Sequence, residues 1–257
     1  MIGAVLLAPL LLLGSCAGSP DAEPWQPLFD GRSLAGWTPK IAGFALGEDP
    51  LGTFVAEDGA IRVRYDRYER FAGRFGHLAY RTPFSAYRLR FEYRFTGTQL
   101  PDVAAWQQSN SGIMLHGQDP ATMARDQQFP VSLEMQLLGA ERAEPGPTGN
   151  LCTPGTNVVM DGRLETTHCI VSTSPVIPNG RWVKAEAEVD RAGNVTHFIE
   201  GQEVMRYSAP QYDPTDADAK PLIEAAGGKL GIERGWLYLQ SEGHPVAFRN
   251  IEIRPLD

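Results

Sequence analysis

Apolar and polar residues alternate with a period of two along much of this chain. Between residues 87 and 95, apolar side chains occupy the odd positions and charged side chains the even ones. Residues 183–189 repeat the pattern with valine and alanine. Since successive side chains of a strand point to opposite faces, each segment predicts a strand with one buried face. Helical periodicity is nearly absent, which favours an all-β protein.

Turn residues separate these segments at short intervals. Hairpins are expected where Gly-containing turns divide apolar runs: Glu57-Asp58-Gly59, Ala192-Gly193-Asn194 and Glu200-Gly201-Gln202. The same pattern predicts further strands at 78–81, 111–116, 131–138, 195–200, 230–240 and 246–253. The apolar parity of the last strand changes near Asn250, which indicates a β-bulge. Many short strands with Gly- and Pro-rich loops are typical of two antiparallel sheets packed as a jelly-roll sandwich.

Three segments are expected to lie outside the regular strands. Residues 99–110, which include Trp106, and 139–167 exceed what a compact sandwich needs, and loops of this length often carry binding functions. Residues 208–221 are polar and Pro-rich and are expected to cross the surface.

Composition narrows the class of protein. The chain has 257 residues, of which 42% are hydrophobic and 21% charged, as in a packed globular protein. No linker-like stretch divides it, so one domain is expected. The formal net charge is −8, and the charged residues are dispersed. A nucleic-acid partner is not expected, because binding to phosphates needs a clustered basic patch.

The N-terminus predicts export. Residues 2–13 form an apolar run that is long enough for a signal peptide but too short to span a bilayer core of about 30 Å. Leu13-Gly14-Ser15-Cys16 resembles the lipobox of bacterial lipoproteins. We therefore expect a signal peptide at 1–15, lipidation at Cys16, a polar tether at 16–24 and the domain at 25–257. The lipid would anchor the protein in the cell envelope, facing the periplasm or the exterior. An ordinary cleaved signal, with Cys16 incidental, is the alternative.

Export also bears on the remaining cysteines. Cys152 and Cys169 would lie in an oxidising compartment, which favours a disulfide across this Pro- and Gly-rich segment. A zinc site formed by Cys152, His168 and Cys169 is the alternative, although the adjacent His168 and Cys169 are awkwardly spaced for one ion.

Six segments in order carry a family resemblance. They are Leu28–Trp37 (LFDGRSLAGW), Phe54–Ile61 (FVAEDGAI), Asn110–Leu115 (NSGIML), Glu134–Leu138 (EMQLL), Gly235–Gln240 (GWLYLQ) through His244, and Phe248–Ile253 (FRNIEI). Together they resemble the 3-keto-disaccharide hydrolase family over about residues 25–257. The resemblance implies a concanavalin A-like lectin/glucanase fold and an enzyme that cleaves 3-keto-glycosides. Residues 148–169 resemble an insertion found in only part of that family.

The residues at the expected site argue against ordinary retaining hydrolysis. A retaining glucanase of this fold carries the strand pattern E-x-D-x-x-E, in which the outer carboxylates act as nucleophile and acid. This chain has Glu134, Gln136 and Gly139 at those positions, so the pair is broken. A 3-keto sugar offers another route, because its ketone acidifies the proton at C2. A base could then remove that proton, and the C1 substituent would leave by elimination before water adds.

The candidate site residues follow from parity and position in these segments. Glu134, His116 and His244 are the catalytic candidates, and the substrate-binding candidates are Asn110, Gln136, Gln240 and Trp106. Glu134 and Gln136 share one face of their strand, opposite the apolar residues. A solvent-facing pair would show the same parity, so the pattern leaves both interpretations open. His77 and His197 are expected at the surface.

Two functions remain open at this point. The first is a glycoside-cleaving hydrolase or lyase that acts on a carbohydrate substrate, and the alternative is a non-catalytic carbohydrate-binding lipoprotein. A polar pocket with a base of shifted pKa would favour the enzyme, whereas a shallow aromatic groove would favour the binding protein. No cofactor is indicated. The sequence lacks the common metal motifs, but scattered carboxylates could still hold a divalent metal such as calcium.

Overall fold

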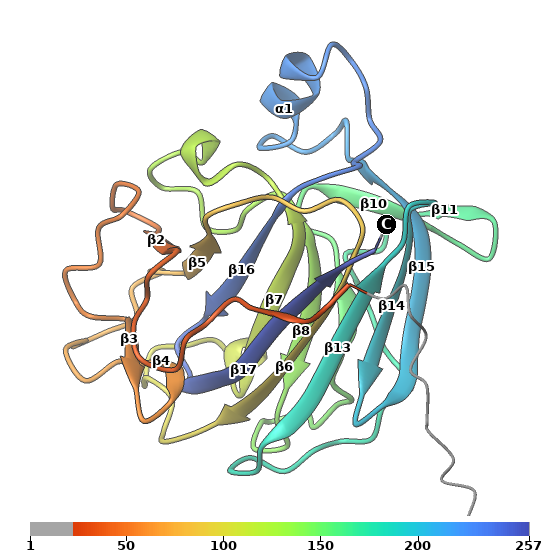
Figure 1. Cartoon of the computed structure of the whole chain (residues 1–257). Helices are drawn as coiled ribbons and strands as arrows, with labels where there is room; N and C mark the ends of the chain where they lie inside the picture. The colour runs from red at the N-terminus through yellow and green to blue at the C-terminus, as the bar shows by residue number, and fades with distance from the viewer. Residues whose placement is uncertain (1–22, 257) are drawn as a thin grey trace, which may run out of the picture.

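Two antiparallel β-sheets pack face to face in the computed structural model of the protein, which describes residues 23–256 (Figure 1). The larger sheet runs in the order β11 (Arg163–Glu165), β10 (Thr156–Met160), β15 (Gln202–Tyr212), β14 (Asn194–Ile199), β13 (Val183–Val189), β6 (Tyr87–Phe95), β17 (Val246–Pro255), β4 (Ala60–Val63) and β3 (Phe54–Glu57). The short strand β1 (Gln26–Pro27) pairs with β17. The all-β jelly-roll sandwich is confirmed.

The second sheet has seven strands. Its order is β12 (Cys169–Ile170), β9 (Asn150–Cys152), β8 (Leu133–Leu138), β7 (Asn110–Gly117), β16 (Trp236–Ser241), β5 (Gly76–Tyr80) and β2 (Trp37–Ile41). The connections carry two 3₁₀ turns, η1 (Ala105–Gln107) and η2 (Pro120–Thr122), and one short helix, α1 (Lys220–Ala225). No helix within residues 23–256 is long and apolar enough to cross a membrane.

The core lies between the sheets, where the apolar faces of alternating strands meet. β6 and β13 have the predicted bounds and pair directly, with Ala185 opposite Phe91. Their odd-numbered side chains are almost fully buried. The charged face of β6 forms ion pairs with its neighbours, such as Arg90 with Glu252 at 2.7 Å. The alternation of apolar and charged residues therefore predicted which face is buried.

Local turn chemistry explains the hairpins. Asp58 and Gly59 have φ angles of 50° and 73° between β3 and β4, the left-handed pair that a tight hairpin needs. The predicted bulge in β17 is confirmed, because the pairing with β6 shifts between Arg249 and Glu252 and Asn250 has a φ of 51°.

The expectations for three segments were wrong in detail. The segment 139–167, which was expected to be a loop, contains the strands β9, β10 and β11, and β12 follows directly after it. These strands are two to five residues long, so no periodicity marks them, and pairing with distant strands creates them. β15 continues to Tyr212, into the segment expected at the surface, and α1 follows it. Residues 230–235 form only isolated bridges rather than the start of β16.

The predicted disulfide between Cys152 and Cys169 is present. The two residues are direct partners on β9 and β12, with their Cα atoms 4.1 Å apart. Both sulfur atoms are used in this bond, so the alternative zinc site with His168 is wrong. Cys16, the predicted signal peptide and most of the tether lie outside the described residues.

Candidate active site

The outer face of the seven-stranded sheet carries a row of polar side chains beneath long loops. In β8, Leu133, Met135 and Leu137 pack in the core between the sheets, so Glu134 and Gln136 point to the opposite face. That face is not open to water, since only 5% of Glu134 is exposed. Of the two interpretations that parity left open, the structure therefore excludes the solvent-facing one for Glu134.

A cavity of about 460 Å³ opens above this face. Four predicted site residues line it: Trp106, Asn110, Glu134 and Gln136. The other lining residues are Phe129, Arg142, Cys152, Pro154, His168, Cys169 and Glu242. The disulfide therefore forms part of the cavity wall, and segments far apart in the sequence meet here.

Two buried carboxyl groups, Glu134 and Glu242, line this cavity. Burial raises the pKa of Glu134 to about 8, and the nearby amide of Gln240 acts in the opposite direction. Burial also raises the pKa of Glu242 well above its ordinary value, and the charge of Glu134 raises it further. Two such carboxyl groups resist simultaneous ionisation, so the pair retains a proton near neutral pH.

A missing side chain makes room for Glu134. Gly112 lies on β7, next to β8, and a Cβ atom there would be only 2.4 Å from Glu134 Oε1. Met114, the residue directly opposite Glu134, pairs on its other side with Tyr238 of β16. The Glu134 carboxyl therefore extends across β7 over Gly112, towards Gln240 of β16.

Several buried polar atoms around the cavity have no hydrogen-bond partner among the described residues. They are Asn110 Oδ1, Arg142 Nη1, Gln240 Oε1 and Nε2, and Glu242 Oε2. Leaving such atoms unpaired costs about 1–3 kcal/mol each, so native proteins rarely do so without a ligand or water to satisfy them. Their convergence from three segments, namely β7, the loop after β8 and the end of β16, indicates a site for a polar ligand.

Arg142 brings a positive charge to the carboxyl pair. Its Nε donates to the Glu144 carbonyl at 3.0 Å, which leaves Nη1 unpaired and buried. Burial lowers the pKa of the guanidinium, and the charge of Glu242 opposes this shift. An arginine remains protonated in proteins, so it can offer N–H donors to an oxyanion in the cavity.

Trp106 forms an aromatic wall at the rim of the cavity. Its side chain is half exposed, at 50%, and its ring stacks on Phe75 with the centroids 6.0 Å apart. The Trp106 carbonyl accepts a hydrogen bond from Asn110 Nδ2 at 3.1 Å. This contact ties the loop of residues 99–110 to the floor of the site.

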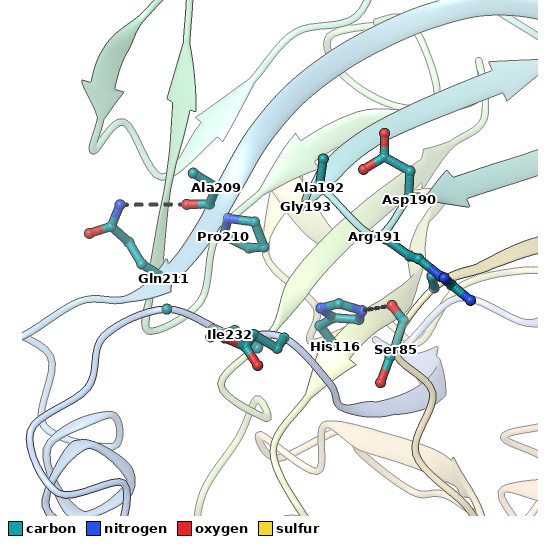
Figure 2. A pocket seen from close by; sticks show the side chains of 13 residues that line it. Ser85, His116, Asp190, Arg191, Ala192, Gly193, Ala209, Pro210, Gln211 and Ile232 are labelled. Atoms are coloured by element: carbon teal, nitrogen blue, oxygen red, sulfur yellow. Dashed lines mark hydrogen bonds between the residues drawn. The ribbon is translucent and has the colours of Figure 1, made fainter. Parts of the chain in front are cut away.

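The structure places His116 away from the other candidates. Its ring lines a different cavity, of about 530 Å³, and its Nε2 lies 3.0 Å from the Ser85 carbonyl. Figure 2 shows the His116 ring pointing towards Ser85 in this cavity. His116 follows the last residue of β7 that pairs with β8, and its φ of 49° turns the chain there. The expectation that it joins Glu134 is therefore wrong.

Two further candidates, His244 and Gln240, lie close to the site, but only Gln240 lies beside Glu134. His244 does not line the cavity, because its ring packs edge-on against Phe95 and its Nδ1 accepts from the Ser109 N–H at 3.3 Å. Gln240 is fully buried beside Glu134 and contributes the amide already described.

The expectation that two other histidines lie at the surface is wrong. His77 and His197 are not at the surface, since both are 0% exposed. His197 contacts the Gly149 carbonyl and the Tyr207 hydroxyl, each at 3.0 Å. His77 packs beneath Phe129 on the outer face of the same sheet that carries Glu134.

Sequence reasoning missed Glu242 and Arg142 as site residues. Glu242 has the same parity as Tyr238 and Gln240 on β16, and that signal was available in the sequence. Arg142 lies in a loop without periodicity, where no sequence signal marks it. Within residues 23–256, no group of three or more His, Cys, Asp or Glu side chains is arranged to hold a metal ion.

Comparison with known proteins identifies the family. Residues 24–254 match the family described as the 3-keto-alpha-glucoside-1,2-lyase-like domain. A 3-keto-disaccharide hydrolase of Bacteroides thetaiotaomicron is 24% identical over 254 residues, covering 92% of this chain and 80% of the relative.

Solved structures show the same fold. A candidate glycosyl hydrolase of Parabacteroides distasonis superposes with a TM-score of 0.54 at 21% identity, covering 91% of this chain and 94% of its own. The Crh5 transglycosylase in complex with NAG reaches a TM-score of 0.51 at 9% identity, covering 92% and 85%. The family match confirms the resemblance seen in the sequence. This chain belongs to the family of 3-keto-alpha-glucoside-1,2-lyase-like domains.

Proposed function

We propose that this protein cleaves the glycosidic bond of 3-keto-glycosides by proton abstraction and elimination, with Glu134 and Glu242 as the proton-transfer pair. The observation that carries the proposal is the pair of buried carboxyl groups in one cavity, with the pKa of Glu134 raised to about 8. The family of the chain and the name of its Bacteroides relative support the substrate class.

The chemistry proceeds in two stages. The ionised carboxylate of the pair removes the proton from C2, which the ketone at C3 makes acidic, and an enolate forms. The electron pair then expels the C1 oxygen, which takes a proton from an acid, leaving a C1–C2 double bond conjugated with the ketone. Water adds at C1 and a proton returns to C2, so the net reaction is hydrolysis.

The side chains around the cavity suit these steps. One carboxyl group of the pair is protonated while the other is ionised, which provides an acid and a base together. Among the described residues, Arg142 Nη1 and the Gln240 amide have no hydrogen-bond partner, and we assign them to the enolate oxygen. Asn110 and Gln136 line the same cavity and would bind sugar hydroxyl groups.

The shape of the site favours an enzyme over a carbohydrate-binding protein. A lectin-like site is a shallow groove lined by aromatic rings, whereas this cavity has buried ionisable groups and one half-exposed tryptophan. Burying two carboxyl groups next to each other destabilises a protein, and proton transfer gives a functional reason for it.

The test compares the protein with its Glu134→Gln and Glu242→Gln variants on a 3-keto-disaccharide and on the parent disaccharide. We expect sugar release from the keto sugar alone and a loss of at least about 100-fold in kcat for each variant. Glu224→Gln, at an exposed position on α1 outside the cavity, is the matched control.

Solvent isotope incorporation distinguishes elimination from direct hydrolysis. In D₂O, elimination introduces deuterium at C2 of the released keto sugar, after correction for exchange without enzyme. Release without deuterium at C2 would contradict the elimination route. Equal activity on the parent disaccharide would contradict the need for a ketone.

We also propose that the chain is exported and anchored to a membrane through Cys16. The support is the apolar N-terminal run with its lipobox-like end, together with the disulfide, which is typical of oxidising compartments. A Cys16→Ala variant is expected to move from the membrane fraction to the soluble fraction. Retention of that variant in the membrane fraction would contradict the anchor.

A further inference from the structure

We propose that a second cavity, adjacent to the carboxyl pair, is the subsite for the leaving sugar, and that it selects neutral or cationic units over anionic ones. This inference rests on the proposed function, because it assigns the keto sugar to the cavity of Glu134 and the departing unit to its neighbour.

The two cavities are adjacent. The second has a volume of about 610 Å³, and it shares Phe129, Pro154 and His168 with the cavity of the carboxyl pair. These three residues therefore lie between the two cavities. A disaccharide whose keto sugar contacts Glu134 would extend past them into the second cavity.

The second cavity is strongly acidic. Asp126, Asp213, Asp216 and Asp218 line it, and no Lys or Arg is among its lining residues. In contrast, Arg142 lines the cavity of the carboxyl pair. A carboxylate or phosphate on the leaving sugar would meet four like charges here, whereas hydroxyl and ammonium groups would find acceptors.

Asn157 independently indicates a ligand. Only 5% of this residue is exposed, and it lines the cavity from β10. Its side chain makes no hydrogen bond with any residue in the described range 23–256, although the other buried amide in this cavity, Gln127, is fully paired with protein atoms. A buried amide without a protein partner is suited to hydrogen-bonding a sugar hydroxyl.

Hydrogen bonds fix two residues of the acidic wall, Asp213 and Asp216. The Asp213 N–H donates to the Gly155 carbonyl at 3.0 Å, which docks the segment after β15 onto the turn between β9 and β10. Asp216 Oδ1 accepts from the N–H groups of Asp218 and Ala219, both at 2.9 Å. A rigid wall can discriminate between ligands by charge, because it cannot move away from an unfavourable one.

The test uses four 3-keto-glycosides with the same keto sugar. Their leaving groups are glucose, glucosamine, glucuronic acid and methanol, and methanol is too small to reach the second cavity. We expect kcat/KM to be lower for glucuronic acid than for glucosamine by at least about tenfold, which is the effect of one unfavourable charge contact.

The Asp213→Asn/Asp218→Asn double variant should remove most of this discrimination and leave the methyl glycoside unchanged. Asparagine retains the oxygen that accepts from Thr215, so the turn is preserved. Asp58→Asn makes the same chemical change in a hairpin turn outside both cavities and should behave as the unaltered protein. Unchanged discrimination in the double variant, or an equal loss on the methyl glycoside, would overturn the proposal.

Failure of the proposed function would look different. In that case no substrate, including the methyl glycoside, would be turned over, and binding becomes the measurement. Calorimetry with the unoxidised glucosamine-containing disaccharide should then show weaker binding to the double variant than to the Asp58→Asn control. Equal binding to both variants would overturn the subsite.

Discussion

Glu134 can occupy its position because Gly112 has no side chain. The carboxyl group crosses β7 at this glycine, with Oε1 2.4 Å from where a Cβ atom would lie. The φ of Gly112 is not in the left-handed region, so the backbone itself would accept alanine. The glycine is therefore required by the carboxyl group rather than by the strand.

The Gly112→Ala substitution tests this requirement. The new methyl group would displace a flexible carboxyl group instead of backbone, so we expect the fold to remain and kcat to fall by about 100-fold through misplacement. The thermal midpoint should change little. Gly231→Ala is the control, since a Cβ atom there meets nothing within 4 Å. Full activity of Gly112→Ala would show that the position of Glu134 is not critical.

The carboxyl pair also predicts how activity depends on pH. Activity needs one protonated and one ionised carboxyl group, so kcat/KM should follow a bell-shaped curve. The acid limb should lie near pH 8, where Glu134 ionises and becomes the base. The alkaline limb should lie at higher pH, where Glu242 loses the proton of the acid. A profile that stays flat between pH 6 and pH 9 would exclude the pair as the acid and base. Rates measured across pH 4–10 decide the question.

At the level of elements, the short strand β12 closes one side of the site. Within residues 23–256 it pairs only with β9, through two residue pairs. The disulfide joins these strands within the cavity wall. Two residue pairs alone would stabilise a strand weakly. The covalent bond therefore holds β12 and His168 beside the groove.

Removing this bond should affect stability and activity together. The bonded residues are 17 apart in the sequence, and closing a loop of that size contributes about 3 kcal/mol to stability. The Cys152→Ser/Cys169→Ser variant should lose about this much in denaturant unfolding and bind substrate more weakly. Reducing agent should weaken the unaltered protein in the same way and leave the variant unchanged. If reducing agent also lowered the free energy of unfolding of the variant, the destabilisation would not come from this disulfide.

For the molecule as a whole, buried ionisable groups govern stability in acid. Burial lowers the pKa of His77 to about 3 and those of His197 and His244 to about 4. Between pH 5.5 and 4.5 the unfolded chain therefore holds between about two and three more protons at these histidines than the folded protein does. Glu134 and Glu242 have raised pKa values and act in the opposite direction, but they release at most two protons.

The balance predicts that stability falls as the pH drops through this window. Each net proton taken up on unfolding contributes a slope of up to about 1.4 kcal/mol per pH unit. Glu134→Gln removes one opposing group, so its stability should fall more steeply over pH 5.5–4.5, while above pH 7 it should exceed the unaltered protein. Urea unfolding at several pH values measures both slopes. Parallel curves would contradict the raised pKa of Glu134.

The sandwich could be predicted because short stretches of neighbouring residues specify its strands and turns. Alternation in β6 and β13 identifies a buried face wherever the strands pair, and Asp58-Gly59 specifies a tight turn through φ angles alone. The parity of Glu134 and Gln136, opposite the apolar residues of β8, is local in the same sense. Fold class, most central strands and several cavity residues therefore followed from neighbouring residues.

Neighbouring residues do not determine which side chains are buried or which distant segments meet at the site. Parity could not distinguish a solvent-facing Glu134 from a catalytic one, because the distant loops that carry Trp106, Phe129 and Arg142 cover it. For the same reason His77 and His197 are buried where the chain suggested surface, and His116 lies in another cavity. Glu134 and Glu242 acquire their raised pKa values only once both are enclosed together, since desolvation and mutual repulsion depend on distances that folding sets. The sequence thus specified the strands and their faces, while the packing of loops across the outer face created the site.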